Sequence, residues 1–379
     1  MKKISISYLD TISGLGRSPE VWSHYQRAIP HFDGLEAIGG INISVEVEKD
    51  FKIFLKDRPD LKKLDRSVCF LIFQAQKFIA LDFDRQETGL NVASSRGATG
   101  LFEKYLKDFL ESKTSSTAVL SSPTTTLGNL SSFLAHELGL SGFEMSHSIT
   151  CSSALHAVVN AVAWLESGRT DQFVVGASEA ANTPFTIAQM RALKVYSKGL
   201  NSEFPVRSMD LEKKNNTMVL GEGSGLMLLK RGEQPDARAY INGLGFASES
   251  VEHPAALSAR AECFQKSMKK ALEDFGEESV DVIVMHAPGT VRGDQAEFHA
   301  VEDVFGDILP ALTSNKWMLG HTLGASGLLS LEMAVLMLEN QKFIANPFYK
   351  CKLPEEINSV MVNAVGFGGN AVSVILTKA

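Results

Sequence analysis

The chain is poor in cysteine and in long apolar runs, and it has no excess of basic charge. Its 379 residues include 4 Cys with no Cys-x-x-Cys pair, so we expect neither a disulfide framework nor a structural metal site. No apolar stretch reaches the ~18 residues that a membrane-spanning helix requires. With 37 Lys+Arg against 44 Asp+Glu, the net charge is −7, which argues against a general nucleic-acid-binding protein.

Apolar residues are abundant: 44% of the chain is hydrophobic and 21% is charged, which predicts a large core rather than disorder. Apolar runs rich in β-branched residues alternate with stretches of helical period, which indicates an α/β fold. The expected strands include residues 173–175, 280–285, 360–362 and 372–376. Because no long apolar stretch follows the N-terminal lysines, we expect no signal peptide and a cytoplasmic location.

Two stretches of the chain resemble each other, which suggests internal duplication. Cys151 and His321 each stand shortly before a predicted helix with one apolar face. Each helix is followed by a strand and an expected small-residue turn, at residues 176–178 and 366–369. Chance similarity between α/β segments is the alternative. The polar stretch from Lys230 to Asp236 is the expected boundary, which gives halves of residues 1–232 and 237–379.

Cys151 is the cysteine whose surroundings suit a nucleophile. It lies at a predicted strand-to-helix junction among the small residues 150–154, and the start of a helix lowers the pKa of a thiol. The alternative is an inert buried cysteine. That alternative is our interpretation of Cys69, Cys263 and Cys351, which lack such a setting.

Two histidines lie in segments that suit an active site. His286 follows the predicted strand 280–285, at the end where open α/β sheets place their sites. His321 opens a run of small residues that continues to Gly327 and lets the backbone approach a ligand closely. We expect the remaining histidines to be structural or on the surface.

These residues, in this order and spacing, resemble the β-ketoacyl-acyl-carrier-protein synthases, the elongating condensing enzymes of thiolase-like fold. Four ordered blocks over nearly the whole chain carry the resemblance: the segment around Cys151; residues 205–210 with Val219-Leu220-Gly221-Glu222-Gly223-Ser224-Gly225; His286 with Glu297 eleven residues later; and Lys316 five residues before His321, closed by residues 363–370. The resemblance implies an α/β fold with a layered αβαβα architecture built from two pseudo-duplicated halves.

The resemblance also implies a reaction and the residues that perform it. Cys151 is expected to accept an acyl group as a thioester. His286 and His321 are expected to donate N–H groups to the enolate oxygen formed when malonyl-ACP loses CO2. Claisen condensation then gives a 3-oxoacyl-ACP, in fatty-acid or specialised polyene or polyketide-type synthesis.

Further roles follow from the same resemblance. The backbone N–H groups of Cys151 and Phe367 would form an oxyanion hole, with Phe367 also acting as a gate. Lys316 and Glu297 would form a buried ion pair beside His321. Thr290 and Gly368 are expected to bind substrate, although Pro288 replaces a threonine that is usual in the family and puts one pantetheine hydrogen bond in doubt.

The implied partner is an acyl carrier protein, whose phosphopantetheine arm presents the malonyl and acyl thioesters; no other cofactor is expected. Because such carriers are acidic, this acidic chain needs a local basic patch, for which Lys62, Lys63 and Lys198 are candidates. A solvated run of charge is the alternative. We expect a homodimer, or a heterodimer with a synthase-like subunit.

Four other classes of protein are alternatives to a condensing enzyme. A non-catalytic, chain-length-controlling partner subunit would shape a pocket without chemistry, but such subunits typically lose the cysteine that this chain keeps. A thiolase would pair its nucleophile with a second cysteine and one histidine. The chain lacks a full dinucleotide-binding fingerprint and a complete Gly-x-Ser-x-Gly motif, which argues against a nicotinamide enzyme and a serine hydrolase.

Overall fold

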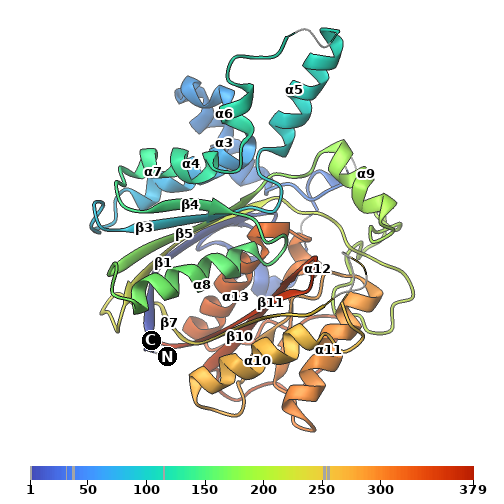
Figure 1. Ribbon diagram of the computed structural model, residues 1–379. Helices are drawn as coiled ribbons and strands as arrows, with labels where there is room; N and C mark the ends of the chain where they lie inside the picture. Colours follow the sequence, from blue (N-terminus) through green and yellow to red (C-terminus); the bar gives the residue numbers. More distant parts are fainter. Residues whose placement is uncertain (1, 31, 36–38, 114–115, 251–252, 254–256) are drawn as a thin grey trace.

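Two β-sheets, covered and separated by helices, form the body of the protein (Figure 1). The first sheet has the order β2-β1-β6-β5-β3-β4 and the second the order β7-β11-β10-β8-β9. The computed structural model describes residues 2–30, 32–35, 39–113, 116–250, 253 and 257–379. The strands are β1 (Ile4–Ser13), β2 (Gly16–Arg17), β3 (Gly89–Ala93), β4 (Glu144–His147), β5 (Gln172–Glu179), β6 (Gly223–Arg231), β7 (Ala239–Ser248), β8 (Val282–Val284), β9 (Ala311–Thr313), β10 (Ser359–Gly366) and β11 (Asn370–Lys378).

The two sheets repeat one topology. Five strands of the first sheet, β1-β6-β5-β3-β4, correspond in order to all five of the second. In each sheet the second of these strands, β6 or β11, is antiparallel to both neighbours. The remaining pairs among these corresponding strands are parallel in both sheets. The first sheet uses residues up to 231 and the second residues from 239 onward, so each sheet comes from one half of the chain.

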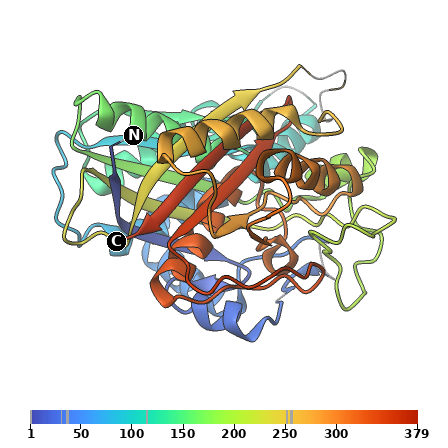
Figure 2. The ribbon, with the colours of Figure 1, turned by 90° about the horizontal axis from the view of Figure 1, so that it is seen from below.

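Helices form three layers around and between the sheets (Figures 1 and 2). α8 (Ser153–Glu166) and α13 (Ser326–Asn340) lie between the sheets. α4 (Arg66–Phe78) and α7 (Asn129–Leu138) cover the outer face of the first sheet, and α10 (Glu262–Phe275) and α11 (Val291–Phe305) the outer face of the second. The other helices are α1 (Val21–Arg27), α3 (Val45–Asp57), η1 (Pro59–Lys63), α5 (Thr99–Glu111), α6 (Ser121–Thr125), α9 (Pro184–Ala192), α12 (Lys316–Leu319) and η2 (Leu323–Ala325).

The composition of the central helices explains their position. Every residue of α13 from Ser326 to Leu338 is buried, and a helix that is apolar on nearly all sides is stable only inside a protein. α8 buries Leu155, Val158 and Leu165 against the same central core. The predicted layered α/β architecture of two similar halves is therefore confirmed.

The expected turn at Gly176-Ala177-Ser178 is wrong. These residues lie inside β5, where Gly176 pairs with Leu226 of β6. A Cβ atom on Gly176 would come 3.2 Å from Cδ2 of Leu226 and 3.3 Å from Cγ2 of Val92. The small residues make room for neighbouring side chains instead of reversing the chain.

The expected turn in the second half is present between β10 and β11. Gly368 and Gly369 adopt φ values of +90° and +71°, which favour glycine. Within the described ranges, no helix is long and apolar enough to cross a membrane, and no three His, Cys, Asp or Glu side chains are grouped as metal ligands.

Candidate active site

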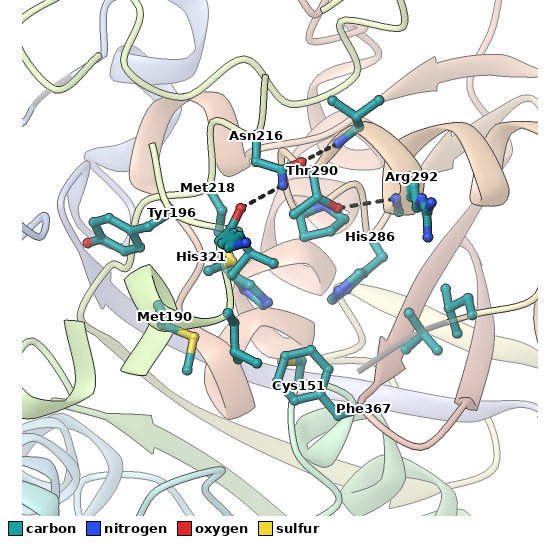
Figure 3. Close-up of a pocket in the computed structure, with 18 of the residues that line it drawn as sticks. Cys151, Met190, Tyr196, Asn216, Met218, His286, Thr290, Arg292, His321 and Phe367 are labelled. Atoms are coloured by element: carbon teal, nitrogen blue, oxygen red, sulfur yellow. Dashed lines mark hydrogen bonds between the residues drawn. The ribbon is translucent and has the colours of Figure 1, made fainter. Parts of the chain in front are cut away.

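A pocket of about 870 Å³ brings together most of the side chains that the sequence singled out. Cys151, His286, Thr290, His321 and Phe367 all line it (Figure 3). Cys151 comes from the first half of the chain and the other four residues come from the second. The pocket therefore lies where the two halves meet.

The loop before α8 holds Cys151 in a strained backbone segment. Thr150 has φ = +48°, a conformation that residues with a β-carbon rarely adopt. The Ser153 hydroxyl donates to the carbonyl oxygen of Thr150 at 2.6 Å and accepts the N–H of Ile149 at 2.8 Å. The Ser152 hydroxyl donates to the Ile149 carbonyl oxygen at 3.0 Å. The two serines thus fix the loop that presents the thiol.

The turn that carries Phe367 packs directly against this loop. A Cβ atom on Gly366 would come 2.6 Å from the carbonyl oxygen of Ile149 and still closer to Oγ1 of Thr150. Only a residue without a side chain fits there. Phe367 is 40% exposed and lies beside Cys151 in Figure 3. Gly368 shapes the turn but does not line the pocket, so its contact with substrate stays a prediction.

His286 and His321 form a close pair of buried imidazoles. Their ring centroids are 5.2 Å apart with an interplanar angle of 82°. Burial, and next the positive charge of Lys316, lower the pKa of both rings well below the ordinary value; for His286 the neighbouring His321 adds to this effect. Both imidazoles are therefore neutral at neutral pH, and each carries one N–H.

Hydrogen bonds hold both the backbone and the ring of His321. Its backbone N–H donates to the Val219 carbonyl oxygen at 2.7 Å. Nδ1 of its ring lies 3.2 Å from Oγ of Ser326, which also accepts the Thr322 hydroxyl at 3.4 Å. Nδ1 of His286 is buried and has no hydrogen-bond partner among the described residues.

Glu297 makes a different contact from the expected one. Its two carboxylate oxygens accept the backbone N–H groups of His286 and Ala287, each at 2.8 Å. No direct ion pair joins it to Lys316 in the described part of the chain, although Lys316 lowers its pKa against the raising effect of burial. Glu297 thus fixes the backbone of His286 rather than lying paired beside His321, because α11 brings it to the end of β8.

Lys316 is a buried cation close enough to act on the nucleophile electrostatically. Burial lowers the pKa of Lys316, while the charge of Glu297 and then the Cys151 thiolate oppose that shift. The same interaction lowers the pKa of Cys151. Lys316 thus acts on the thiol by charge from outside the pocket lining, whereas the two histidines share the pocket with the thiol.

The expected net lowering of the thiol pKa is not found. Burial, and next the charge of Glu179, raise the pKa of Cys151 to about 12, and the lowering effects of Lys316 and of the backbone N–H of Cys151 are smaller. A helix start offers only partial charges, whereas full burial removes the water that would solvate a thiolate. The thiol form therefore dominates at neutral pH.

Glu179 was not found from the sequence. It ends β5 fully buried, and one of its oxygens accepts the Ser94 hydroxyl at 2.8 Å and the N–H groups of Ser95 and Arg96. The other oxygen has no hydrogen-bond partner among the described residues. The available signal was a glutamate that follows the apolar residues 173–175 and the small residues 176–178.

Four exposed cations surround the opening of the pocket. We call them the rim: Lys194, Lys198, Lys214 and Arg292. Of the described residues that line the pocket, none is an Asp or a Glu. The sequence singled out only Lys198 of this group.

The other expected carrier-docking residues, Lys62 and Lys63, are exposed on η1 and do not line the pocket. Their role stays a prediction. Thr290 does line the pocket, where its hydroxyl also accepts the N–H of Gly293 at 3.2 Å and caps α11.

The chain is similar in sequence to known proteins over most of its length. The beta-ketoacyl synthase N-terminal domain model matches residues 40–235 and the beta-ketoacyl synthase C-terminal domain model matches residues 238–349. The chain is 27% identical over 411 residues to the 3-oxoacyl-[acyl-carrier-protein] synthase 2 of Coxiella burnetii, covering 100% of this chain and 99% of that one. It is 24% identical over 412 residues to the protein of the same name from Staphylococcus aureus (strain COL), covering 100% and 98%.

Solved structures share the fold. A beta-ketoacyl synthase from Burkholderia phymatum matches with a TM-score of 0.83 and 21% identity, covering 100% of both chains. The ishigamide ketosynthase/chain length factor matches with a TM-score of 0.82 and 20% identity, covering 100% of this chain and 99% of that one. Since the two domain models together match residues 40–349 almost without a gap, the chain belongs to the beta-ketoacyl synthase family.

Proposed function

We propose that the chain is an active condensing enzyme that transfers an acyl group to Cys151, decarboxylates malonyl-ACP and joins the two into a 3-oxoacyl-ACP. One observation carries this proposal: a buried thiol and two neutral imidazoles line a single pocket. A thiol can hold an acyl group covalently, and paired neutral N–H donors suit a developing oxyanion. The curated relatives, which are named synthases, support the same reaction.

In the first step, Sγ of Cys151 attacks the thioester carbonyl of an acyl-ACP. The bond between that carbonyl carbon and the carrier's sulfur breaks, and the proton lost by Cys151 ends on the departing carrier thiol. Because burial raises the pKa of Cys151, the cation of Lys316 matters as the group that stabilises the transient thiolate. The backbone N–H groups of Cys151 and Phe367 are proposed to bind the tetrahedral oxyanion.

In the second step, malonyl-ACP loses CO2 as its carbon–carbon bond breaks, and the electron pair forms an enolate. His286 and His321 donate their N–H groups to the enolate oxygen. The enolate carbon then attacks the acyl carbonyl on Cys151, the bond to Sγ breaks, and the thiolate takes up a proton. Glu297 keeps His286 in place by binding its backbone N–H.

The rim supports an acyl carrier protein as the partner. Its four cations face no carboxylate of the pocket lining, which suits both an acidic carrier and the phosphate of its arm. A solved relative of this fold is described as a type II PKS acyl-carrier protein in complex with its ketosynthase, with a TM-score of 0.84 at 20% identity. We propose that this chain works as a homodimer, or as a heterodimer with a synthase-like subunit, in the cytoplasm.

Intact-mass measurement tests the proposal. The protein is incubated with a panel of acyl-ACPs of different chain length, and then with malonyl-ACP. We expect an acyl adduct on the wild-type protein, no adduct on Cys151→Ala, and a 3-oxoacyl-ACP only when malonyl-ACP is present. No adduct from any acyl-ACP would overturn the proposal, and product without malonyl-ACP would indicate thiolase chemistry.

The alternative is a non-catalytic, chain-length-controlling subunit. What favours it is that two solved structures with the same fold are described with a chain length factor. Under this alternative the chain alone forms no adduct, but its addition to a catalytic partner changes the length of that partner's products. The adduct on Cys151 separates the two functions.

Charge reversal tests the docking surface. If the rim receives the carrier, Lys198→Glu should raise KM for acyl-ACP roughly tenfold while leaving acyl-pantetheine thioesters, which lack the carrier, much less affected. Lys62→Glu with Lys63→Glu is the matched change on η1. An effect of the η1 variant alone would move the docking surface away from the rim.

A further inference from the structure

One side chain joins the two walls of the pocket opening. Nδ2 of Asn216 donates to the carbonyl oxygen of Lys194 at 2.8 Å, and Oδ1 of Asn216 accepts the N–H of Val291 at 2.8 Å (Figure 3). Lys194 follows α9 and belongs to the wall formed by residues 190–196. Val291 begins α11 and belongs to the wall that contains His286 and Thr290.

Both groups that Asn216 binds are backbone groups at helix ends. Lys194 lies just beyond the C-terminal end of α9 with φ = +58°, and Val291 is the first residue of α11. Carbonyl groups at the end of a helix and N–H groups at the start of one lack partners within the helix. A carboxamide is a side chain that can donate to one and accept from the other at the same time.

The segment that carries Asn216 is bonded to both walls. Nζ of Lys213 forms a buried ion pair with Asp294 of α11 at 2.6 Å. The N–H and the hydroxyl of Thr217 both donate to the Gly289 carbonyl oxygen, at 2.8 and 2.9 Å. Next to the opposite wall, the Ser197 N–H donates to the Met218 carbonyl oxygen at 2.8 Å. The bond from Asn216 to Lys194 extends this second contact to the end of α9.

We propose that Asn216 is a positioning residue that holds the end of α9 against the start of α11, and so sets the fit of the opening to a pantetheine arm. This inference rests on the proposed function. Asn216 has no place in the bond-making steps, which occur at Cys151 and the two histidines. Its loss should therefore weaken the binding of long pantetheine-linked substrates while sparing small reagents that reach the thiol without filling the opening.

Two variants separate this role from simple capping of α11. Asn216→Ala removes both hydrogen bonds. Asn216→Asp keeps an acceptor for the N–H of Val291 and adds negative charge at the start of α11, which is favourable there. It also places a carboxylate oxygen against the Lys194 carbonyl, so the bond to the end of α9 is lost in both variants.

Two reagents measure the effect at Cys151: iodoacetamide, which is small, and chloroacetyl-pantetheine, which fills the opening. We expect the concentration for half-maximal labelling by chloroacetyl-pantetheine, and KM for acyl-ACP, to rise roughly fivefold to tenfold in both variants. Labelling by iodoacetamide and kcat should stay within about twofold of wild type. Asn201→Ala, a change of an exposed asparagine outside the pocket, is the matched control.

Wild-type behaviour of Asn216→Asp would overturn the inference, because capping of α11 would then be the whole role of the side chain. Loss of iodoacetamide labelling in either variant would also overturn it, because the site itself would have been disturbed. The labelling assays need no condensation. A wild-type protein that forms no 3-oxoacyl product would therefore count against the proposed function without deciding the role of Asn216.

Discussion

The two halves of the molecule have sheets of the same topology, but they place different side chains in the pocket. Cys151 lies between β4 and α8, and His321 occupies the corresponding place between β9 and α13. At the end of β8 the second half places His286, whereas the first half places Ser94 at the end of β3. Corresponding ends of two similar sheets thus meet at one pocket, with the thiol from one half and both imidazoles from the other.

Each half also contains a buried glutamate that accepts two backbone N–H groups. Glu297 accepts two consecutive backbone N–H groups at the end of β8, and Glu179 accepts two consecutive N–H groups at the end of β3. In the second half the carboxylate fixes a histidine. In the first half Ser94 follows β3, and the charge of Glu179 raises the pKa of Cys151. Similar contacts thus have different consequences in the two halves.

The largest expected effect is the loss of the nucleophile from the first half. Cys151→Ala should abolish the acyl adduct and lower condensation by at least about 1000-fold, because no other cysteine lines the pocket in the described part of the chain. Intact mass and product formation measure both. Cys351→Ala, a change of a half-buried cysteine outside the pocket, is the control and should keep the adduct. An adduct that survives Cys151→Ala would break the assignment of the nucleophile to the first half.

Removal of either oxyanion donor from the second half comes next. His286→Ala and His321→Ala should each lower the rate of malonyl-ACP decarboxylation roughly 100-fold to 1000-fold, while leaving acylation of Cys151 much less affected. Release of CO2 and adduct formation are measured separately. His136→Ala on the exposed face of α7 serves as control. Equal loss of both steps would contradict a division of labour between the halves.

Opposite charges from the two halves should move the thiol pKa in opposite directions. Glu179 raises the pKa of Cys151 and Lys316 lowers it. Glu179→Gln should therefore speed alkylation of Cys151 at pH 9, roughly tenfold for a shift of about one pKa unit. Burial lowers the pKa of Lys316 to about 8, so Lys316→Met should slow alkylation by a similar factor at pH 7, where the amine is charged, and much less at pH 9. The wild-type rate should still be rising with pH at pH 10, since the thiol pKa is about 12.

Iodoacetamide labelling across pH measures these shifts. Glu179→Gln should react faster than wild type at pH 9, and Lys316→Met should react more slowly than wild type at pH 7. If both variants moved the rate in the same direction, the effect would come from a disturbed pocket rather than from charge.

The smallest effect concerns backbone strain beside His286. Ala287 has φ = +27°, where glycine is favoured, so Ala287→Gly should raise the free energy of unfolding by about 1 kcal/mol. Ala296→Gly, in the interior of α11, should instead lower it by at least about 1 kcal/mol. Chemical denaturation measures both, and destabilisation by Ala287→Gly would show that the methyl group of Ala287 contributes more by packing than it costs in strain.

The layered fold and three pocket residues could be predicted because they depend mainly on residue type and its spacing along the chain. Alternating apolar segments indicated the layered fold, and Cys151, His286 and His321 were found because few residue types can perform their chemistry. The sequence could not show that Glu297 binds backbone N–H groups, since α11 and β8 meet only in the fold.

The pKa of Cys151 and the link made by Asn216 were beyond sequence reasoning for a similar physical reason. A helix start is visible in the sequence, but the loss of water around the thiol depends on how both halves pack around it. Asn216 binds Val291, 75 residues away, and nothing near it in the sequence indicates that contact. The turn predicted at residues 176–178 was wrong because small residues occur where strands pack closely as well as in turns.

The contact between Gly366 and the loop before Cys151 limits how this protein can be re-engineered. There is no space for even one carbon atom at Gly366, so the β10–β11 hairpin of the second half packs directly against the segment that presents the thiol and fixes its shape. A chimera that joins the first half of one relative to the second half of another must therefore match hairpin to loop before any substrate preference is considered. The halves resemble each other, but they are not exchangeable modules.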